Sequence, residues 1–197
     1  VERYMPDTLQ VRVAERVPMA QIWAWQRDGA GETDYDCVRL QLDETGHVMT
    51  PIDGHSVVAP EDQAEWSLPV VSGINLGKLK TLAPGRPAGL PKLRAALGLI
   101  GEFRRSPLSG TVDLRVIDLS QPRILRVTTG DGGQVDLSTE RLPRQLNRWA
   151  GIQAHGQKFG LAIETVDLSV TNNVPVRWML SPTIAEDLKR GRKVARI

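Results

Sequence analysis

The sequence predicts an α+β fold in which the end of one module leads into a second module, a bent antiparallel β-sheet packed by two helices. Apolar and polar residues alternate with the period of strands over several stretches of the 197-residue chain. Two longer stretches, residues 90–105 and 140–158, repeat their apolar residues with the period of helices. We expect three parts: the end of a first domain in residues 1–19, a β domain in residues 20–180, and a short helix with a basic tail in residues 181–197.

The boundary between the first two parts is predicted at Pro18. Leu9, Val11 and Val13 alternate with polar residues as in a half-buried strand. Pro18 cannot donate to a strand ladder, and a second extended run, Ala20 to Trp25, follows at once. Two strands that meet at a proline without a loop indicate a change of sheet. We therefore expect the residues before Pro18 and those after Ala20 to lie in different sheets.

The β domain is predicted to begin with two hairpins. A polar, glycine-rich stretch, Arg27 to Asp34, connects its first strand with a second strand that contains Cys37. The next hairpin spans Leu40 to Met49, and Gly46 supplies the positive φ of its turn. A short strand is predicted within Leu68 to Gly73. We interpret Cys37, the one cysteine, as a buried structural thiol, because the sequence identifies no cationic neighbour that would activate it.

Two helices are expected to cover the sheet. The first runs from Leu90 to Arg105, after a surface connection in residues 74–89, and Pro91 suits its first turn. The second runs from Glu140 to Lys158 and carries Trp149 on its apolar face. Its apolar side chains are expected to be buried against one face of a later strand. The residues in this predicted contact are Leu142, Leu146 and Trp149 on the helix and Val166, Leu168 and Val170 on the strand.

Between the helices, the alternation predicts a meander of three strands, at residues 112–116, 123–128 and 134–137. Gly130-Asp-Gly-Gly133 links the last two strands. A glycine-rich loop that cradles phosphate is followed by a helix N-terminus aimed at the ligand. Because a strand follows here, we interpret the loop as a hairpin turn.

The composition sets limits on function. The net charge is only +2, which is not that of a general nucleic-acid binder with a concentrated basic stripe. No apolar run approaches the roughly 20 residues of a membrane span. Since there is neither a signal peptide nor an initiating Met, and a recognisable motif starts at Arg3, we expect this chain to be part of a longer protein.

No catalytic, cofactor or metal site is predicted. His47, Asp53 and His55, with Asp43 upstream, lie close enough in sequence to consider metal binding. We interpret them as solvated loop residues. The sequence contains no nucleophile elbow, no zinc-protease helix motif and no phosphate-loop motif. We therefore predict a protein that is not an enzyme.

The C-terminal tail carries a group of basic residues, from Lys189 to Lys193 and at Arg196. It is interpreted as a solvated tail. The alternative is contact with anionic lipid head groups or with an acidic segment of a partner.

Three motifs, taken in order, resemble one family. They are Arg3-Tyr-Met-Pro-Asp-Thr-Leu9 with Glu15-Arg-Val-Pro-Met-Ala20 and Trp23, then Leu68-Pro-Val-Val-Ser-Gly73, then Val166-Asp-Leu168. Together they resemble the end of the POTRA domain (polypeptide-transport-associated) and the following β domain of the bacterial division protein FtsQ/DivIB. Ser169 departs from the family, which has an arginine at this place.

This resemblance implies a noncatalytic scaffold of the divisome that recruits FtsB- and FtsL-like partners on the periplasmic side for septum assembly. It also implies a single-pass protein of the cell inner membrane, with the transmembrane helix outside this chain, and it implies no nucleic acid and no cofactor. The alternative is a POTRA-like chaperone or transport module of another cell-envelope complex. A single transmembrane helix before residue 1 favours division, whereas tandem POTRA repeats favour transport.

The partner site is predicted at the last pair of strands, Val166 to Met179. Asn172-Asn173 is a turn signal, and Pro175 confines its strand to an edge of the sheet because it lacks a backbone donor. We expect this missing donor to face outward, so that a partner strand pairs at Arg177 and Met179. The alternative is that Pro175 blocks pairing. With the positions implied by the resemblance, the expected partner-binding residues are Val170, Asn172, Pro175, Arg177, Trp178 and Met179.

Overall fold

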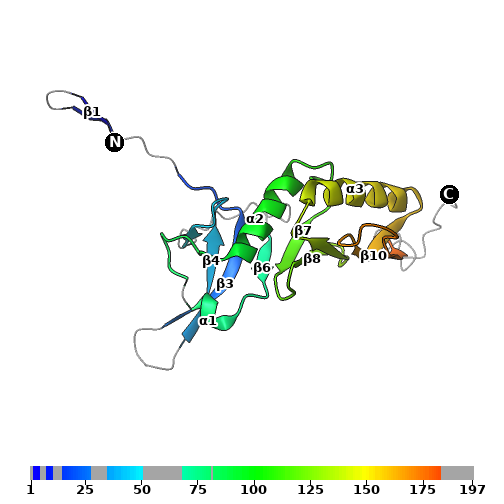
Figure 1. The fold of residues 1–197 in the computed structure, drawn as a ribbon, viewed down its shortest axis with the longest axis horizontal. Helices are drawn as coiled ribbons and strands as arrows, with labels where there is room; N and C mark the ends of the chain where they lie inside the picture. Colours follow the sequence, from blue (N-terminus) through cyan, green and yellow to red (C-terminus); the bar gives the residue numbers. More distant parts are fainter. Residues whose placement is uncertain are drawn as a thin grey trace.

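The computed structural model describes residues 2–4, 8–10, 15–27, 35–50, 68–80 and 82–182. Its strands and helices follow one another as shown in Figure 1. The first six strands are β1 (Glu2–Tyr4), β2 (Thr8–Gln10), β3 (Ala20–Arg27), β4 (Tyr35–Leu42), β5 (Val48–Met49) and β6 (Val70–Ser72). The remaining elements are α1 (Leu76–Leu79), α2 (Pro91–Arg104), β7 (Leu114–Asp118), β8 (Ile124–Thr129), β9 (Gln134–Ser138), α3 (Leu142–Lys158), β10 (Leu161–Asp167) and β11 (Val176–Leu180).

The strands form two sheets. β1 and β2 pair with each other, and the other nine strands form one sheet in the order β11-β10-β9-β8-β7-β6-β3-β4-β5. The predicted change of sheet is confirmed, because β2 lies in the first sheet and β3 begins at Ala20 in the second. The POTRA assignment of residues 1–19 stays a prediction, as do the other domain bounds. The basic tail beyond Pro182 and the loop residues Asp53 and His55 lie outside the described residues.

The α+β class and the two packing helices are confirmed, but the sheet is mixed rather than antiparallel. β3 pairs with β6, β6 with β7 and β9 with β10 in parallel. Parallel neighbours need a long crossover connection, commonly a helix. Here α2 lies in the connection between β6 and β7, and α3 in the connection between β9 and β10. The predicted hairpins β3–β4, β4–β5, β7–β8, β8–β9 and β10–β11 are all antiparallel, as expected.

One row of apolar residues crosses the nine-stranded sheet from β4 to β11 and forms the centre of the core. Each residue of the row is the register partner of the next, on adjacent strands. The row is Leu40, Ile22, Val71, Ile117, Val127, Val135, Val166 and Val176. All of them belong to or pack against a single buried cluster that also includes residues of α2 and α3. The two helices therefore cover the same face of the sheet.

The helices α2 and α3 are joined by a contact between aromatic rings. The ring centroids of Phe103 and Trp149 lie 5.9 Å apart, and Trp149 is only 1% exposed. Trp149 and Leu146 are buried as predicted, whereas Leu142 and Val170 are half-buried. The surface connection predicted before α2 contains the one-turn helix α1. Gly46 has the expected positive φ of 81° in the β4–β5 turn.

The row next to the apolar one carries charges and lies on the opposite face of the sheet. Asp118, Arg126, Asp136 and Asp167 are register partners across β7, β8, β9 and β10. Nε of Arg126 lies 2.7 Å from Oδ1 of Asp136, and its Nη2 lies 2.8 Å from Oδ2. The hydrogen bond to Asp136 and the negative charges of the three carboxylates raise the pKa of Arg126. This face is polar because the helices described here cover only the other one.

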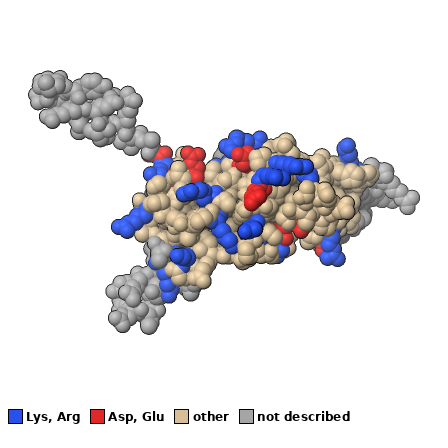
Figure 2. All heavy atoms as spheres, viewed as in Figure 1, with Lys and Arg blue, Asp and Glu red and all other residues tan. Residues whose placement is uncertain are grey.

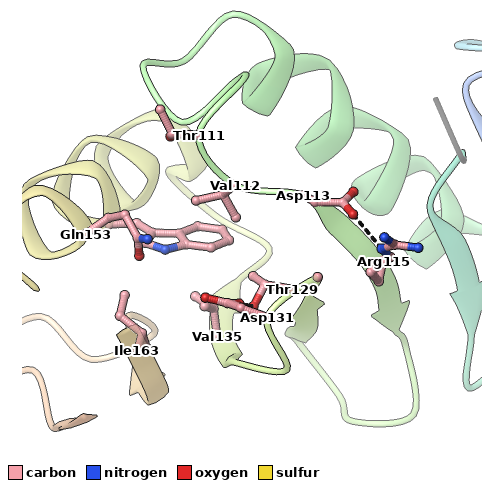
Figure 3. A pocket seen from close by; sticks show the side chains of 11 residues that line it. Thr111, Val112, Asp113, Arg115, Thr129, Asp131, Val135, Gln153 and Ile163 are labelled. Atoms are coloured by element: carbon pink, nitrogen blue, oxygen red, sulfur yellow. Dashed lines mark hydrogen bonds and ion pairs between the residues drawn. The ribbon is translucent and has the colours of Figure 1, made fainter. Parts of the chain in front are cut away.

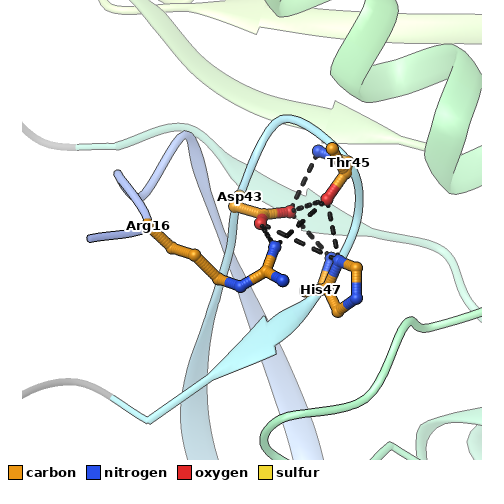
Figure 4. Close-up of polar contacts among 4 residues, drawn as sticks. All are labelled: Arg16, Asp43, Thr45 and His47. Carbon is orange, nitrogen blue, oxygen red and sulfur yellow. Dashed lines mark hydrogen bonds and ion pairs between the residues drawn. The ribbon is translucent and has the colours of Figure 1, made fainter. Parts of the chain in front are cut away.

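The segment that precedes β3 is attached to the β4–β5 turn through Asp43 (Figure 4). The Asp43 carboxylate, with its side chain 5% exposed, forms an ion pair with Arg16. It also accepts hydrogen bonds from the backbone N–H and hydroxyl of Thr45, at 2.9 and 2.7 Å, and from the backbone N–H of His47, at 2.8 Å. Burial raises the pKa of Asp43, but these hydrogen bonds outweigh it and lower the pKa to about 2. Asp43 therefore has a structural role as an ionised carboxylate.

Candidate functional site

The candidate site is β11, which forms one edge of the nine-stranded sheet. It pairs with β10 in antiparallel fashion, with Val166 opposite Val176 and Ile163 opposite Trp178. A bulge lies between Ile163 and Thr165 on the β10 side. The edge position predicted from Pro175 is confirmed, and Pro175 itself lies immediately before the strand.

Side chains hold the first half of the connection from β10 to β11 in place. Arg148 of α3 donates hydrogen bonds to the carbonyl oxygens of Val170, at 3.0 Å, and Thr171, at 3.1 Å. Oδ1 of Asp167 accepts from the backbone N–H and the hydroxyl of Ser169, at 2.9 and 2.6 Å. Asn173 adopts a left-handed conformation with φ 51°, which asparagine tolerates better than most residues. The turn predicted at Asn172-Asn173 is thus an ordered connection.

Trp178 anchors β11 to the C-terminal end of α3. Its ring lies so close to Gly156 that a β-carbon built on this glycine would be 2.4 Å from Cζ3 of Trp178 and 2.9 Å from the carbonyl oxygen of Leu161. The His155 ring centroid is 6.3 Å from that of Trp178 and 5.0 Å from that of Phe159. Trp178 therefore supports the strand from the helix-covered side.

The side chains of the site alternate between the two faces as predicted. Val174, Val176 and Trp178 are partly buried against the core, and Pro175 and Arg177 are exposed. The side chain of Met179 is half-buried. Asn172 is exposed in the connection. The structure thus brings Pro175, Arg177, Trp178 and Met179 together on one short segment and places Val170 and Asn172 in the loop that leads into it.

The backbone direction differs from the prediction. The N–H of Asp167 donates to the carbonyl oxygen of Pro175 at 3.3 Å. The backbone groups of Pro175 therefore face β10 rather than the outside of the sheet. Hydrogen-bonded pairs alternate with non-bonded pairs along an antiparallel ladder, so residues two apart point the same way. Arg177 and Met179 therefore also face β10, and the bond from the Ser181 N–H to the Gly160 carbonyl, at 3.1 Å, fits the same phase.

It follows that the outward-facing backbone groups of β11 belong to Val176, Trp178 and Leu180. Val176 and Leu180 were not among the predicted site residues, because the missing donor of Pro175 was expected to lie outside the sheet. The register is what decides this point, since it places Pro175 opposite Asp167. Leu180 is also 52% exposed, which is unusual for a large apolar residue among those described.

The other edge of the sheet, β5, is covered by a loop. The backbone N–H of Val48 donates to the carbonyl oxygen of Arg86 at 2.9 Å, and the N–H of Gly85 donates to the carbonyl oxygen of Val48 at 2.8 Å. An isolated bridge joins His47 to Pro87. Of the two terminal strands of this sheet, β11 is therefore the one whose outer side has no backbone partner within the described residues.

The residues considered for metal binding or a reactive thiol lie only partly in the described part of the chain. Among the described residues, no group of three or more His, Cys, Asp or Glu side chains could hold a metal ion. His47 contacts the hydroxyl of Thr45 through Nδ1 at 2.8 Å. The backbone of Cys37 lies in β4, but its side chain is outside the described part. None of the described helices is long and apolar enough to cross a membrane.

Charged side chains lie scattered over the molecular surface seen in Figure 2, where basic residues outnumber acidic ones. On α3, Arg144, Arg148 and Lys158 are basic and no residue is acidic. Of these three side chains, Arg148 is the one with recorded hydrogen bonds to the loop between β10 and β11. Arg177 is the charged residue of β11, and its side chain is exposed.

Comparison with known proteins gives one result. The family model described as the C-terminal part of cell division protein FtsQ/DivIB matches residues 35–169, well over half of the chain. The match begins at the start of β4 and ends in the connection after β10. A search of curated proteins found no match.

Proposed function

Since the chain belongs to the FtsQ/DivIB family of cell division proteins, we propose that it is a noncatalytic divisome scaffold that binds FtsB- and FtsL-like partners by strand addition to β11. In this proposal the domain lies on the periplasmic side of the inner membrane, and a transmembrane helix outside the present chain anchors it. Recruitment of these partners would precede septum assembly.

The open edge at β11 is the observation that carries this proposal. The outward-facing N–H and C=O groups of Val176, Trp178 and Leu180 are arranged as one side of a β-ladder. An unpaired edge is a template for an added strand, and main-chain hydrogen bonds then supply much of the affinity. The two other predicted roles of Pro175, as an outward-facing gap or as a block to pairing, are not favoured, because its carbonyl oxygen is bonded to β10.

The rigidity of the edge also favours binding. Trp178 is wedged against Gly156, and Arg148 holds the loop that leads into β11. A strand held in its bound conformation loses little conformational entropy when a partner pairs with it. The side chains on the two faces would then select the partner strand. The exposed Arg177 favours an acidic neighbour on one face, and Leu180 favours an apolar one.

Proline substitution at Leu180 tests this proposal, with the alanine variant as the control. Leu180→Pro removes an outward-facing donor and places a ring at the edge, whereas Leu180→Ala removes only the side chain. We expect Leu180→Pro to weaken the binding of the FtsB-like partner of the same organism by about tenfold or more, measured by calorimetry. Leu180→Ala should weaken it less, and both variants should keep the circular dichroism of the fold.

Met179→Pro is the matched variant that removes a backbone donor facing β10 instead of one facing outward. Because the N–H of Met179 faces β10, its loss should lower the stability of the domain itself. Partner binding of wild-type strength by Leu180→Pro would exclude pairing at the β11 edge.

A further inference from the structure

A cavity of about 260 Å³ is lined by residues of α3 and of the sheet strands β7, β8, β9 and β10 (Figure 3). Gln153 on α3, Val135 on β9 and Ile163 on β10 form part of its wall, and Asp113 and Arg115 come from the start of β7. The turn between β8 and β9 contributes Asp131. The cavity thus has a polar rim and an apolar wall.

The rim carries more negative than positive charge. Asp113 forms an ion pair with Arg115, so the charge of this arginine is already balanced. Oδ1 of Asp131 accepts hydrogen bonds from the hydroxyl of Thr129 and, at 3.5 Å, from the backbone N–H of Gly133. No hydrogen bond within the described residues engages Oδ2 of Asp131. The cavity therefore offers acceptor oxygens with a formal charge of about −1 overall.

Trp149 contributes a hydrogen-bond donor from the inside of the protein. Its side chain lines the cavity although the residue is only 1% exposed. The indole N–H makes no hydrogen bond to the described part of the chain. In that part, every side-chain nitrogen or oxygen that is fully shielded from solvent has a hydrogen-bond partner. The indole nitrogen is therefore not fully shielded from solvent. Because the residue is otherwise buried, we infer that this nitrogen is accessible from the cavity that Trp149 lines. A buried indole N–H normally has a partner.

We propose that this cavity binds a neutral, hydroxylated ring ligand of the size of one pyranose sugar. A hydroxyl group both accepts and donates, so one ligand can accept from the Trp149 N–H and donate to Asp131. The C–H face of such a ring can pack on Val112, the partly buried apolar residue that lines the cavity. The amide of Gln153 offers a further donor and acceptor at the rim.

Other chemical classes fit this cavity less well. An anion would meet the carboxylates of Asp113 and Asp131. A cation would satisfy these carboxylates but leave the Trp149 N–H without an acceptor, at the cost of a buried unpaired donor. An apolar ligand would leave both kinds of group unpaired. The inference does not depend on the proposed function, because none of the cavity residues belongs to β11.

Three sugars of the same ring size but different charge test the proposal: glucose, the cation glucosamine and the anion glucuronate. The readout is the indole N–H signal of Trp149 in nitrogen–proton correlation NMR, assigned by comparison with Trp149→Phe. The signals of the other four of the five tryptophans serve as internal references. We expect glucose to shift the Trp149 signal in a saturable way at millimolar concentration, with weaker effects of the two charged sugars.

Two variants connect the shift to the cavity. Asp131→Ala and Gln153→Ala should each weaken glucose binding by about fivefold or more. Glu164→Ala, which changes an exposed carboxylate on β10 that does not line the cavity, should leave it unchanged. The proposal is overturned if glucose produces no saturable shift, if glucosamine or glucuronate binds more tightly, or if both cavity variants bind glucose like the wild type.

Discussion

The Trp178 ring on β11 rests on Gly156 of α3 with no room for a β-carbon between them: a β-carbon there would lie 2.4 Å from Cζ3 of the ring. This contact joins the candidate edge strand to the helix that covers the sheet. The Trp178 ring is the large side chain that packs β11 against the core on this side of the sheet.

Gly156→Ala should therefore move Trp178 and destabilise the domain. Overpacking of this kind costs about 1 to 3 kcal/mol, measured as the free energy of unfolding in denaturant. Gly151→Ala is the matched control on the same helix, because a β-carbon there meets nothing within 4 Å. Replacing a helical glycine by alanine without a clash stabilises by about 0.5 to 1 kcal/mol. Equal effects of the two substitutions would mean that Trp178 does not rest on Gly156.

Trp149→Ala should destabilise the domain by about 3 to 5 kcal/mol, because the side chain is 1% exposed and contacts Phe103 across the helix pair. Chemical denaturation measures this loss. Trp23→Ala, at a residue that is 48% exposed, should change the stability by less than about 1 kcal/mol. A similarly small effect at Trp149 would contradict its place in the core.

Asp43 should make the stability depend on pH in the acid range. Its pKa in the folded protein is about 2, below its ordinary value of 3.8, so the unfolded state binds the proton more tightly. The contribution of Asp43 is complete above the unfolded pKa and is lost as the pH falls from about 4 to about 2. It amounts to roughly 2 kcal/mol. Unfolding curves at several pH values should show this loss for the wild type.

Asp43→Asn should remove that part of the pH dependence and lower the stability near neutral pH. Glu44→Gln provides the control, because Glu44 is the exposed neighbour in the same turn. A wild-type pH profile in Asp43→Asn would show that the hydrogen bonds from Thr45 and His47 are not what stabilises the carboxylate.

Arg148→Ala should loosen the connection between β10 and β11. The substitution removes the two hydrogen bonds to the carbonyl oxygens of Val170 and Thr171, with an expected cost of about 1 to 2 kcal/mol. Hydrogen exchange of the β11 amides should become faster. Arg144→Ala, an exposed arginine one turn earlier on α3, should change stability by less than about 0.5 kcal/mol. Unchanged exchange in Arg148→Ala would show that β11 does not depend on this contact.

The sequence predicted the features that depend on local pattern. The hairpin turn at Gly46 and the burial of Trp149 follow from residue type and period, and both were confirmed. The edge position of β11 followed from Pro175. Such patterns are visible because side-chain direction repeats every two residues in a strand and about every four in a helix.

The sequence did not predict which strands are neighbours. Val70 to Ser72 is only three residues long, yet it pairs in parallel with both β3 and β7. These pairings join segments far apart in the chain. The crossover helices are visible in the sequence, but their pattern does not say which strands they bring together. The phase of β11 was missed for the same reason: Pro175 and Asp167 are opposite each other only in the assembled register.

The difference between the two ends of the large sheet has a consequence for assembly. With β5 covered by the loop at Gly85 to Pro87, β11 is the terminal strand of the described sheet that an added strand can extend. Two copies could meet β11 to β11, but such a pair would consume both edges. Self-association through β11 and strand addition by a partner would then be mutually exclusive, and a rising protein concentration would compete with the partner for the same strand.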